Sequence, residues 1–402
     1  MEKILTYSLS VFGALLLSSV NLSASVSPES LVELRTKLDR PLLSGEERDQ
    51  KVVVRIEVEG AEVERLVRAP LNLAIVLDRS GSMSGAKLEQ AKQAALMLVD
   101  QLDEDDILSL VLYESEVEVA VHAGPLGKRR SEIKRAIRRI ETGGSTALYD
   151  GVAMGGCELE EFLSDDRINR IMLLSDGIAN VGPSSNREIA NLGTRLSRKG
   201  LSVTTIGLGN DYNETLMTAL AEASDANYYY VADVEALPEV FRNELGELKS
   251  VIARNLEIEI RCPKGVRPLR FLGRPGELKS REESLVFGTL SSSQTREIYF
   301  ECLVERDAIG DITEIVELEA RFSEVASGKE SVVSATPVVV GYSDDVKLVE
   351  KSINEEVVAE SIIWANAVET ERSIALADEG KFEESRANIA SQKAALTKAL
   401  PS

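Results

Sequence analysis

Histidine, cysteine and basic residues are scarce in this chain of 402 residues. It has 1 His and 3 Cys, and 67 Asp and Glu outnumber 46 Lys and Arg, for a formal net charge of −21. The shortage of clustered cations argues against nucleic acid or an anionic membrane surface as a partner. The single His, His122, follows a predicted strand, and no nucleophile-elbow motif is present, which argues against a Ser-His-Asp hydrolase.

The three cysteines are Cys157, Cys262 and Cys302, and none of their spacings resembles a zinc site. Cys262 and Cys302 lie in the same predicted β-rich segment, where a disulfide would form if the chain is exported. Two free, buried thiols in that segment fit the sequence equally well, and the odd count leaves Cys157 alone on an apolar helix.

The first 25 residues have the pattern of a secretory signal peptide. Lys3 precedes an apolar stretch at 4–17, and small residues follow at 23–25. We therefore expect residues 1–25 to be removed and the protein to be periplasmic or secreted. A retained membrane anchor is the alternative, although the stretch is short for a span. No later apolar run is long enough to cross a bilayer, so no membrane insertion is expected after cleavage.

The remaining composition, 44% hydrophobic and 28% charged, is that of a globular protein with two or three domains. From residue 70 to 252 apolar strands alternate with amphipathic helices. This pattern predicts an α/β domain with a doubly wound, mostly parallel sheet. The adjoining runs at 107–113 and 116–121 are joined tightly, which predicts one antiparallel hairpin in that sheet.

Oxygen-bearing side chains follow the predicted strands at three places. Asp78 ends a buried strand and is followed by Ser80 and Ser82, Thr146 lies in a Gly-rich turn before a helix, and Asp176 ends another buried strand. In an open α/β sheet, ligands bind outside the carboxyl ends of the strands. Hard cations such as Mg²⁺ prefer these oxygen ligands, but the first loop by itself fits helix capping equally well.

Together, the three motifs resemble the von Willebrand factor type A (VWA) domain family over about residues 70–252. The chain has Asp-x-Ser-x-Ser from Asp78, Gly-Gly-Ser-Thr-Ala-Leu-Tyr-Asp-Gly around Thr146, and Asp-Gly after the strand that ends before Asp176. The order and spacing of the motifs match the family. The resemblance implies a metal-ion-dependent adhesion site (MIDAS), whose ligand positions are all present.

The resemblance implies that Ser80, Ser82 and Thr146 bind the metal directly, whereas Asp78 and Asp176 contact it largely through water. It further implies Mg²⁺, or else Mn²⁺ or Ca²⁺, and a partner protein whose acidic side chain completes the coordination. We therefore expect a protein-binding function and no enzymatic activity. The alternative is a metal-dependent hydrolase or phosphoryl-transfer enzyme centred on Asp78, although a second carboxylate is missing where Ser80 stands.

The segments on either side of the α/β domain predict a second domain. Residues 253–342 contain short alternating strands separated by turns, typical of an antiparallel β-sandwich, and a strand at 52–58 within residues 26–69 completes it. The α/β domain would then be an insertion, an arrangement that resembles secreted bacterial and inter-alpha-trypsin-inhibitor-like members of the family. A short helix is expected at 30–38. Residues 343–402 predict a helical hairpin packed on the sandwich, with Trp364 in its core.

Overall fold

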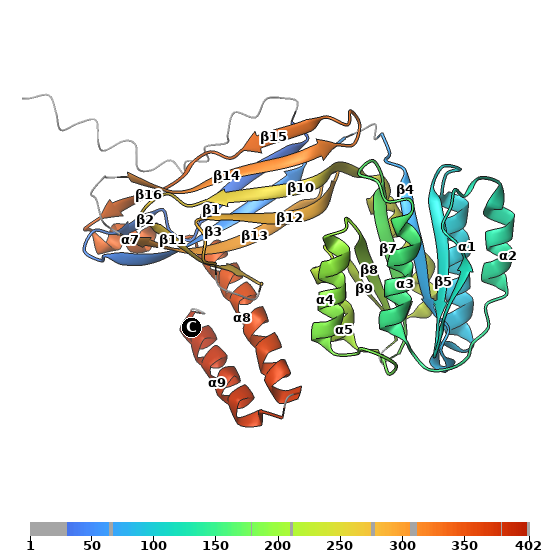
Figure 1. Ribbon diagram of the computed structural model, residues 1–402. Helices are drawn as coiled ribbons and strands as arrows, with labels where there is room; N and C mark the ends of the chain where they lie inside the picture. Colours follow the sequence, from blue (N-terminus) through green and yellow to red (C-terminus); the bar gives the residue numbers. More distant parts are fainter. Residues whose placement is uncertain are drawn as a thin grey trace, which may run out of the picture.

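The computed structural model describes residues 30–63, 67–177, 179–209, 212–274, 278–305, 312–378 and 380–399 (Figure 1). The predicted signal peptide lies outside these ranges. Within them, no helix is both long enough and apolar enough to cross a membrane. The chain forms an α/β domain, a β-sandwich beside it, and two long helices that extend from the sandwich (Figure 1).

The α/β domain contains the predicted doubly wound sheet, with strand order β6-β5-β4-β7-β8-β9. All neighbouring strands are parallel except β5 and β6, which form the predicted antiparallel hairpin. Its strands are β4 (Leu71–Asp78), β5 (Ile107–Tyr113), β6 (Val117–Val121), β7 (Ile168–Ser175), β8 (Ser202–Leu208) and β9 (Tyr228–Val231). Its helices are α1 (Ala86–Gln101), α2 (Arg130–Arg138), α3 (Leu148–Glu160), α4 (Asn186–Ser197), α5 (Glu214–Ala223) and α6 (Leu237–Lys249).

Strand β4 is central to this domain, and all of its residues are buried. Because side chains alternate along a strand, Leu73 and Ile75 pack on the side of α1, α2 and α6, whereas Ala74 and Val76 pack on the side of α3, α4 and α5. Helix α3 lies very close to β4, since a Cβ on Gly155 would come within 2.6 Å of Val76 Cγ2. Because Gly155 has no side chain, α3 and the loop before it can pack this closely against the sheet.

Two mostly antiparallel sheets form the sandwich, with strand orders β1-β3-β13-β11 and β12-β10-β14-β16-β2; β15 also pairs with β14. The pair β16 and β2 is parallel. As predicted, β3 precedes the α/β domain in the chain and pairs with β13 beyond it. The strands are β1 (Val32–Leu38), β2 (Leu42–Ser44), β3 (Asp49–Gly60), β10 (Val251–Arg261), β11 (Val266–Leu272), β12 (Glu282–Ser291), β13 (Thr295–Glu305), β14 (Ile312–Glu324), β15 (Glu330–Ser334) and β16 (Val338–Ser343).

The prediction of a helix at 30–38 is wrong, because residues 32–38 form strand β1. Val32 and Leu34 are buried on one side of strand β1, which pairs with β3 along its whole length. A neighbouring strand that needs a partner thus overrides the weak helical pattern. The break between strands β15 and β16 contains Pro337, which has no N–H to donate to a ladder.

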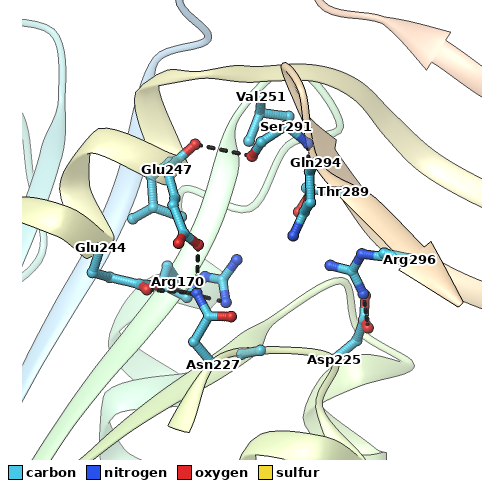
Figure 2. A pocket seen from close by; sticks show the side chains of 12 residues that line it. Arg170, Asp225, Asn227, Glu244, Glu247, Val251, Thr289, Ser291, Gln294 and Arg296 are labelled. Carbon is cyan, nitrogen blue, oxygen red and sulfur yellow. Dashed lines mark hydrogen bonds and ion pairs between the residues drawn. The ribbon is translucent and has the colours of Figure 1, made fainter. Parts of the chain in front are cut away.

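Polar contacts join the sandwich to the edge of the α/β sheet where β4 and β7 begin (Figure 2). Arg296 of β13 donates to Asp225 at 2.5 Å, and Ser291 Oγ donates to the carbonyl of Glu247 at 3.1 Å. The cavity between them, of about 20 Å³, has room for one water. The opposite sheet edge, where the strands end, faces away from the sandwich.

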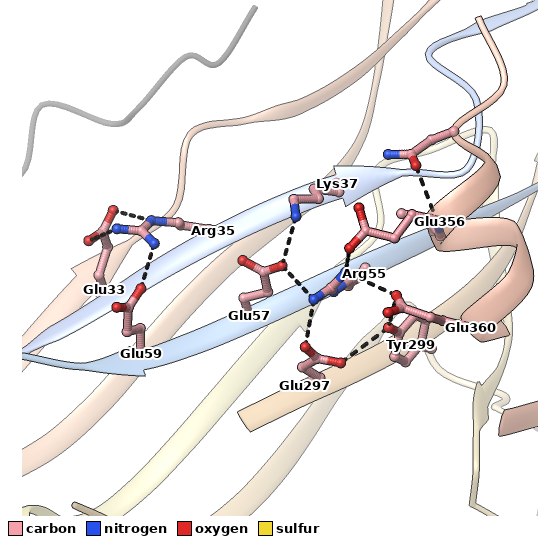
Figure 3. A network of polar contacts seen from close by, with 12 residues as sticks. Glu33, Arg35, Lys37, Arg55, Glu57, Glu59, Glu297, Tyr299, Glu356 and Glu360 are labelled. Carbon is pink, nitrogen blue, oxygen red and sulfur yellow. Dashed lines mark hydrogen bonds and ion pairs between the residues drawn. The ribbon is translucent and has the colours of Figure 1, made fainter. Parts of the chain in front are cut away.

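The C-terminal helices are α7 (Val346–Lys351), α8 (Glu355–Asp378) and α9 (Phe382–Ala399), and the last two form the predicted hairpin. Arg55 of β3 attaches α8 to the sandwich by donating to Glu356 at 3.0 Å and Glu360 at 2.9 Å (Figure 3). Trp364 lies against Tyr299 at a ring distance of 6.1 Å but is 42% exposed, so the core position expected for it is wrong.

The cysteines are free thiols. Cys262 and Cys302 are buried in the sandwich core, which agrees with the second of the two alternatives left open by the sequence. Burial raises the pKa of Cys262 to about 12 and raises that of Cys302 as well, so both thiols are unreactive near neutral pH. Cys157 on α3 is exposed.

Candidate metal centre

Asp78 lies at the end of β4 and is fully buried. Both of its carboxylate oxygens accept hydrogen bonds: Oδ1 from the backbone N–H of Ser80 at 2.8 Å, and Oδ2 from Ser175 Oγ at 2.8 Å. Burial raises the pKa of Asp78, although these hydrogen bonds oppose the shift. The carboxylate is thus held in one orientation by neutral donors.

The two serines of the first loop connect Asp78 to the third loop. Ser80 Oγ lies 3.1 Å from Ser82 Oγ, and Ser82 Oγ donates to Asp176 Oδ1 at 2.7 Å. Asp176 is fully buried at the end of β7, whereas Ser82 is exposed. The contacts therefore link two buried carboxylates through hydroxyls, of which that of Ser82 lies at the surface.

Thr146 belongs to the second loop, which is bonded to both of the others. The backbone N–H of Gly81 donates to the carbonyl of Gly144 at 3.2 Å, and the N–H of Thr146 donates to Asn180 Oδ1 at 2.8 Å. A Cβ on Gly177 would lie 3.3 Å from Thr146 Oγ1 and 3.5 Å from Ser82 Oγ. The structure thus brings all five predicted residues, Asp78, Ser80, Ser82, Thr146 and Asp176, together at one edge of the sheet.

Helix capping does not explain the hydroxyls in this cluster. The N-cap of α1 is Gly85 and that of α3 is Ala147, and neither makes a side-chain cap hydrogen bond. Ser80 precedes a short 3-10 helix (Gly81–Met83), but its side chain does not cap it. The three hydroxyls are therefore left for another role.

The donor set suits a hard cation that keeps several waters. It combines three neutral hydroxyls with two carboxylates, and glycine at position 177 leaves space next to Thr146 and Ser82. Among the described residues, no group of three or more His, Cys, Asp and Glu side chains is arranged to hold a metal. A site here would consequently depend on hydroxyl oxygens, and the residues present fit that role.

Sequence reasoning missed two side chains that contact the cluster. Ser175 donates to Asp78, and Lys87 Nζ donates to Asp176 Oδ2 at 2.5 Å. A hydroxyl at the end of the apolar run 168–175 was a usable signal for Ser175. Lys87 carried no such signal, because a charged residue in the first turn of a helix is usually solvated.

A family model for the von Willebrand factor type A domain matches residues 72–243. An uncharacterized protein of Synechocystis is 28% identical over 277 residues, which cover 66% of this chain and 65% of that protein. Human inter-alpha-trypsin inhibitor heavy chain H3 is 32% identical over 162 residues, 38% of this chain and 18% of that protein. The chain thus spans less than two thirds of the length of these relatives.

Two solved structures share the fold over most of the chain. A von Willebrand factor type A protein from Catenulispora acidiphila has a TM-score of 0.67 at 17% identity, covering 87% of this chain and 82% of its own. The ArnB paralog VWA2 from Sulfolobus acidocaldarius has a TM-score of 0.60 at 19% identity, covering 92% and 91%. Residues 72–243 form a VWA domain, and the chain is a VWA-domain protein.

Proposed function

We propose that this protein binds another protein through a divalent metal ion, with an acidic side chain of the partner as a ligand of that ion. VWA domains typically mediate protein interaction and adhesion, and they often hold a divalent ion at a MIDAS. The observation that carries the proposal is the meeting of three loops, in which Ser82 Oγ lies 3.1 Å from Ser80 Oγ and donates to Asp176 at 2.7 Å.

In this proposal Ser80, Ser82 and Thr146 bind the ion directly, and Asp78 and Asp176 bind its waters. The ion is Mg²⁺ or, in its place, Mn²⁺ or Ca²⁺. When bound, it supplies positive charge that neutral hydroxyl ligands do not cancel, and a partner carboxylate is attracted to that charge. The residues of the three loops would hold the ion in place and leave its solvent-facing side accessible to the partner's carboxylate.

The position of the site favours access by a large partner. The sandwich contacts the sheet edge where β4 begins, and the loops lie at the edge where it ends. These edges are separated by about 25 Å, the length of a strand of this size. Gly81 and Ser82 are exposed at the site's mouth. A protein can therefore approach without meeting the sandwich.

The enzymatic alternative has no observation in its favour. A nucleophilic Asp78 would have to reach a substrate, but its side chain is fully buried and is held in one orientation by hydrogen bonds from Ser80 N–H and Ser175 Oγ. His122 follows β6, which runs antiparallel to β5, so it lies at the opposite edge of the sheet and pairs with Glu158 at 3.1 Å. VWA proteins are also generally non-catalytic.

Export is part of the proposal, and the signal-peptide pattern of residues 1–25 supports it. Cells that express the full chain are fractionated, and the N-terminus of the product is determined by mass spectrometry. We expect the protein in the periplasm or the medium, beginning directly after Ala24 or Ser25. An intact N-terminus in the membrane fraction would instead establish a retained anchor.

The binding proposal is tested by affinity capture from the native envelope, with Mg²⁺ or with EDTA. We expect a partner that is captured by the wild type in Mg²⁺ and lost in EDTA. Asp78→Ala should lose that partner, and Asp150→Ala, which removes an exposed carboxylate on α3 close to the site, should retain it. A partner that is captured equally in EDTA would show that the metal site is not the contact surface.

A further inference from the structure

Lys87 is a charged group of the site that the five-residue motif does not include. It lies in the first turn of α1, and its Nζ donates to Asp176 Oδ2 at 2.5 Å, while Ser82 Oγ donates to Oδ1 of the same carboxylate at 2.7 Å. Asp176 is fully buried, and the side chain of Lys87 is 27% exposed. Within the part of the chain that the structure describes, each oxygen of Asp176 thus has one hydrogen-bond partner, and the partner on Oδ2 is the charged one.

The other charges near the loops do not replace this pair. Both hydrogen-bond donors to Asp78 are neutral, as described above. Arg79 is next to Asp78 in the sequence, but its guanidinium pairs with Glu118 at 3.0 Å and Glu114 at 3.5 Å. Among the described residues, Lys87 is therefore the cation that offsets the charge of the two buried carboxylates.

The charge balance of the cluster follows directly. Asp78, Asp176 and Lys87 together carry a net charge of −1, the sum of two negative charges and one positive. A divalent ion brings this sum to +1, whereas without Lys87 it would be 0. A cluster with net positive charge attracts a carboxylate, and a neutral cluster has no such long-range attraction.

We propose that Lys87 is a specificity-determining residue of the metal site, which weakens the binding of the metal and strengthens the binding of the partner's carboxylate. It also positions Asp176, because its bond to Oδ2 directs Oδ1 towards Ser82. This inference rests on the proposed metal-dependent function. Its distinguishing feature is that one substitution changes two affinities in opposite directions, which loss of packing alone would not do.

The test uses Lys87→Met, which keeps the length of the side chain and removes its charge. Mn²⁺ is titrated by calorimetry, and acetate is then titrated into the Mn²⁺-loaded protein while water-proton relaxation reports the waters that remain on the ion. We expect Mn²⁺ to bind about tenfold more tightly and acetate about tenfold more weakly than in wild type, as for the loss of one unit charge beside a hydrated divalent ion. Lys92→Met on the same helix, whose partner is Glu89, should change neither affinity.

Thermal unfolding in EDTA supplies a readout that does not require metal. Lys87→Met should unfold at a lower temperature than wild type in EDTA, because Asp176 is left buried beside Asp78 without its cation, and Mn²⁺ should stabilise this variant more than wild type. If Lys87→Met does not fold, Lys87→Gln retains a donor and allows the same comparison.

The outcomes separate this inference from the proposed function. If wild type binds Mn²⁺ but Lys87→Met binds it no more tightly, or if acetate affinity is unchanged, the role of Lys87 is refuted and the metal site stands. If wild type itself binds no Mn²⁺, the proposed function fails, and the role of Lys87 fails with it.

Discussion

Gly177 lies among the hydroxyls of the site, and a single methyl group added there tests whether they form a binding cradle. In Gly177→Ala the new Cβ would lie 3.3 Å from Thr146 Oγ1 and 3.5 Å from Ser82 Oγ. The methyl would thus occupy space from which the two hydroxyls have to reach an ion. Metal binding should be impaired although no ligand atom has been removed.

The expected effect on folding is small. The backbone of Gly177 lies outside the left-handed region, so alanine introduces no strain, and replacing glycine at such a position stabilises a protein by about 0.4–1 kcal/mol through the unfolded state. The tight contact with Thr146 offsets part of this gain. We expect the free energy of unfolding to change by less than about 1 kcal/mol, whereas Mn²⁺ affinity should fall at least about tenfold, the equivalent of about 1.4 kcal/mol.

Calorimetric titration with Mn²⁺ measures the affinity, and denaturant unfolding in EDTA measures the stability. Gly143→Ala is the matched control, because it lies in the second loop and its Cβ would meet the carboxylate of Glu114 at 3.5 Å instead of a ligand hydroxyl. It should bind Mn²⁺ as wild type does. If Gly177→Ala also binds Mn²⁺ with unchanged affinity, the space between Thr146 and Ser82 is not where the ion is bound.

Other predictions concern the scaffold. Gly155→Ala should destabilise the protein by about 1–3 kcal/mol in denaturant unfolding, because the new Cβ would clash with Val76. Gly246→Ala on helix α6, where a Cβ would have no neighbour within 4 Å, should stabilise the protein by about 0.5–1 kcal/mol. Equal effects of the two substitutions would contradict the close packing of α3 on the sheet. Burial raises the pKa of Asp39, so its ionisation costs the native state more than the unfolded state as the pH rises above about 4. The free energy of unfolding of wild type should therefore fall relative to that of Asp39→Asn as the pH rises from about 4. A difference between the two proteins that does not change with pH would contradict the raised pKa. Cys157 alone should react with a thiol reagent in the native protein, and three thiols should react after denaturation; a total of one would reveal a disulfide.

Much of the α/β domain was predictable from local patterns. Buried parallel strands are continuous apolar runs, so β4 and β7 are evident in the sequence, and each ends at or just before a carboxylate. Since such strands end at the same sheet edge, the motifs around Asp78 and Asp176 placed the candidate site before the fold was known.

What could not be predicted depends on contacts between distant segments. Strand β1 has an ambiguous local pattern and is extended because β3 offers it a partner. Lys87 has an ordinary position on an amphipathic helix, and only the approach of α1 to the end of β7 gives it a buried carboxylate to bind. Trp364 was expected in the core, but its ring packs against Tyr299 while much of the Trp364 side chain is exposed to solvent.

Anomalous diffraction from crystals soaked in Mn²⁺ tests the central claim most directly, because it locates the ion without reference to any partner. We predict a peak bounded by the hydroxyls of Ser80, Ser82 and Thr146, and its absence from crystals of Ser82→Ala. A well-occupied peak elsewhere on the chain, or no peak at this edge of the sheet at saturating Mn²⁺, would contradict the assignment of these loops as a metal-dependent binding site.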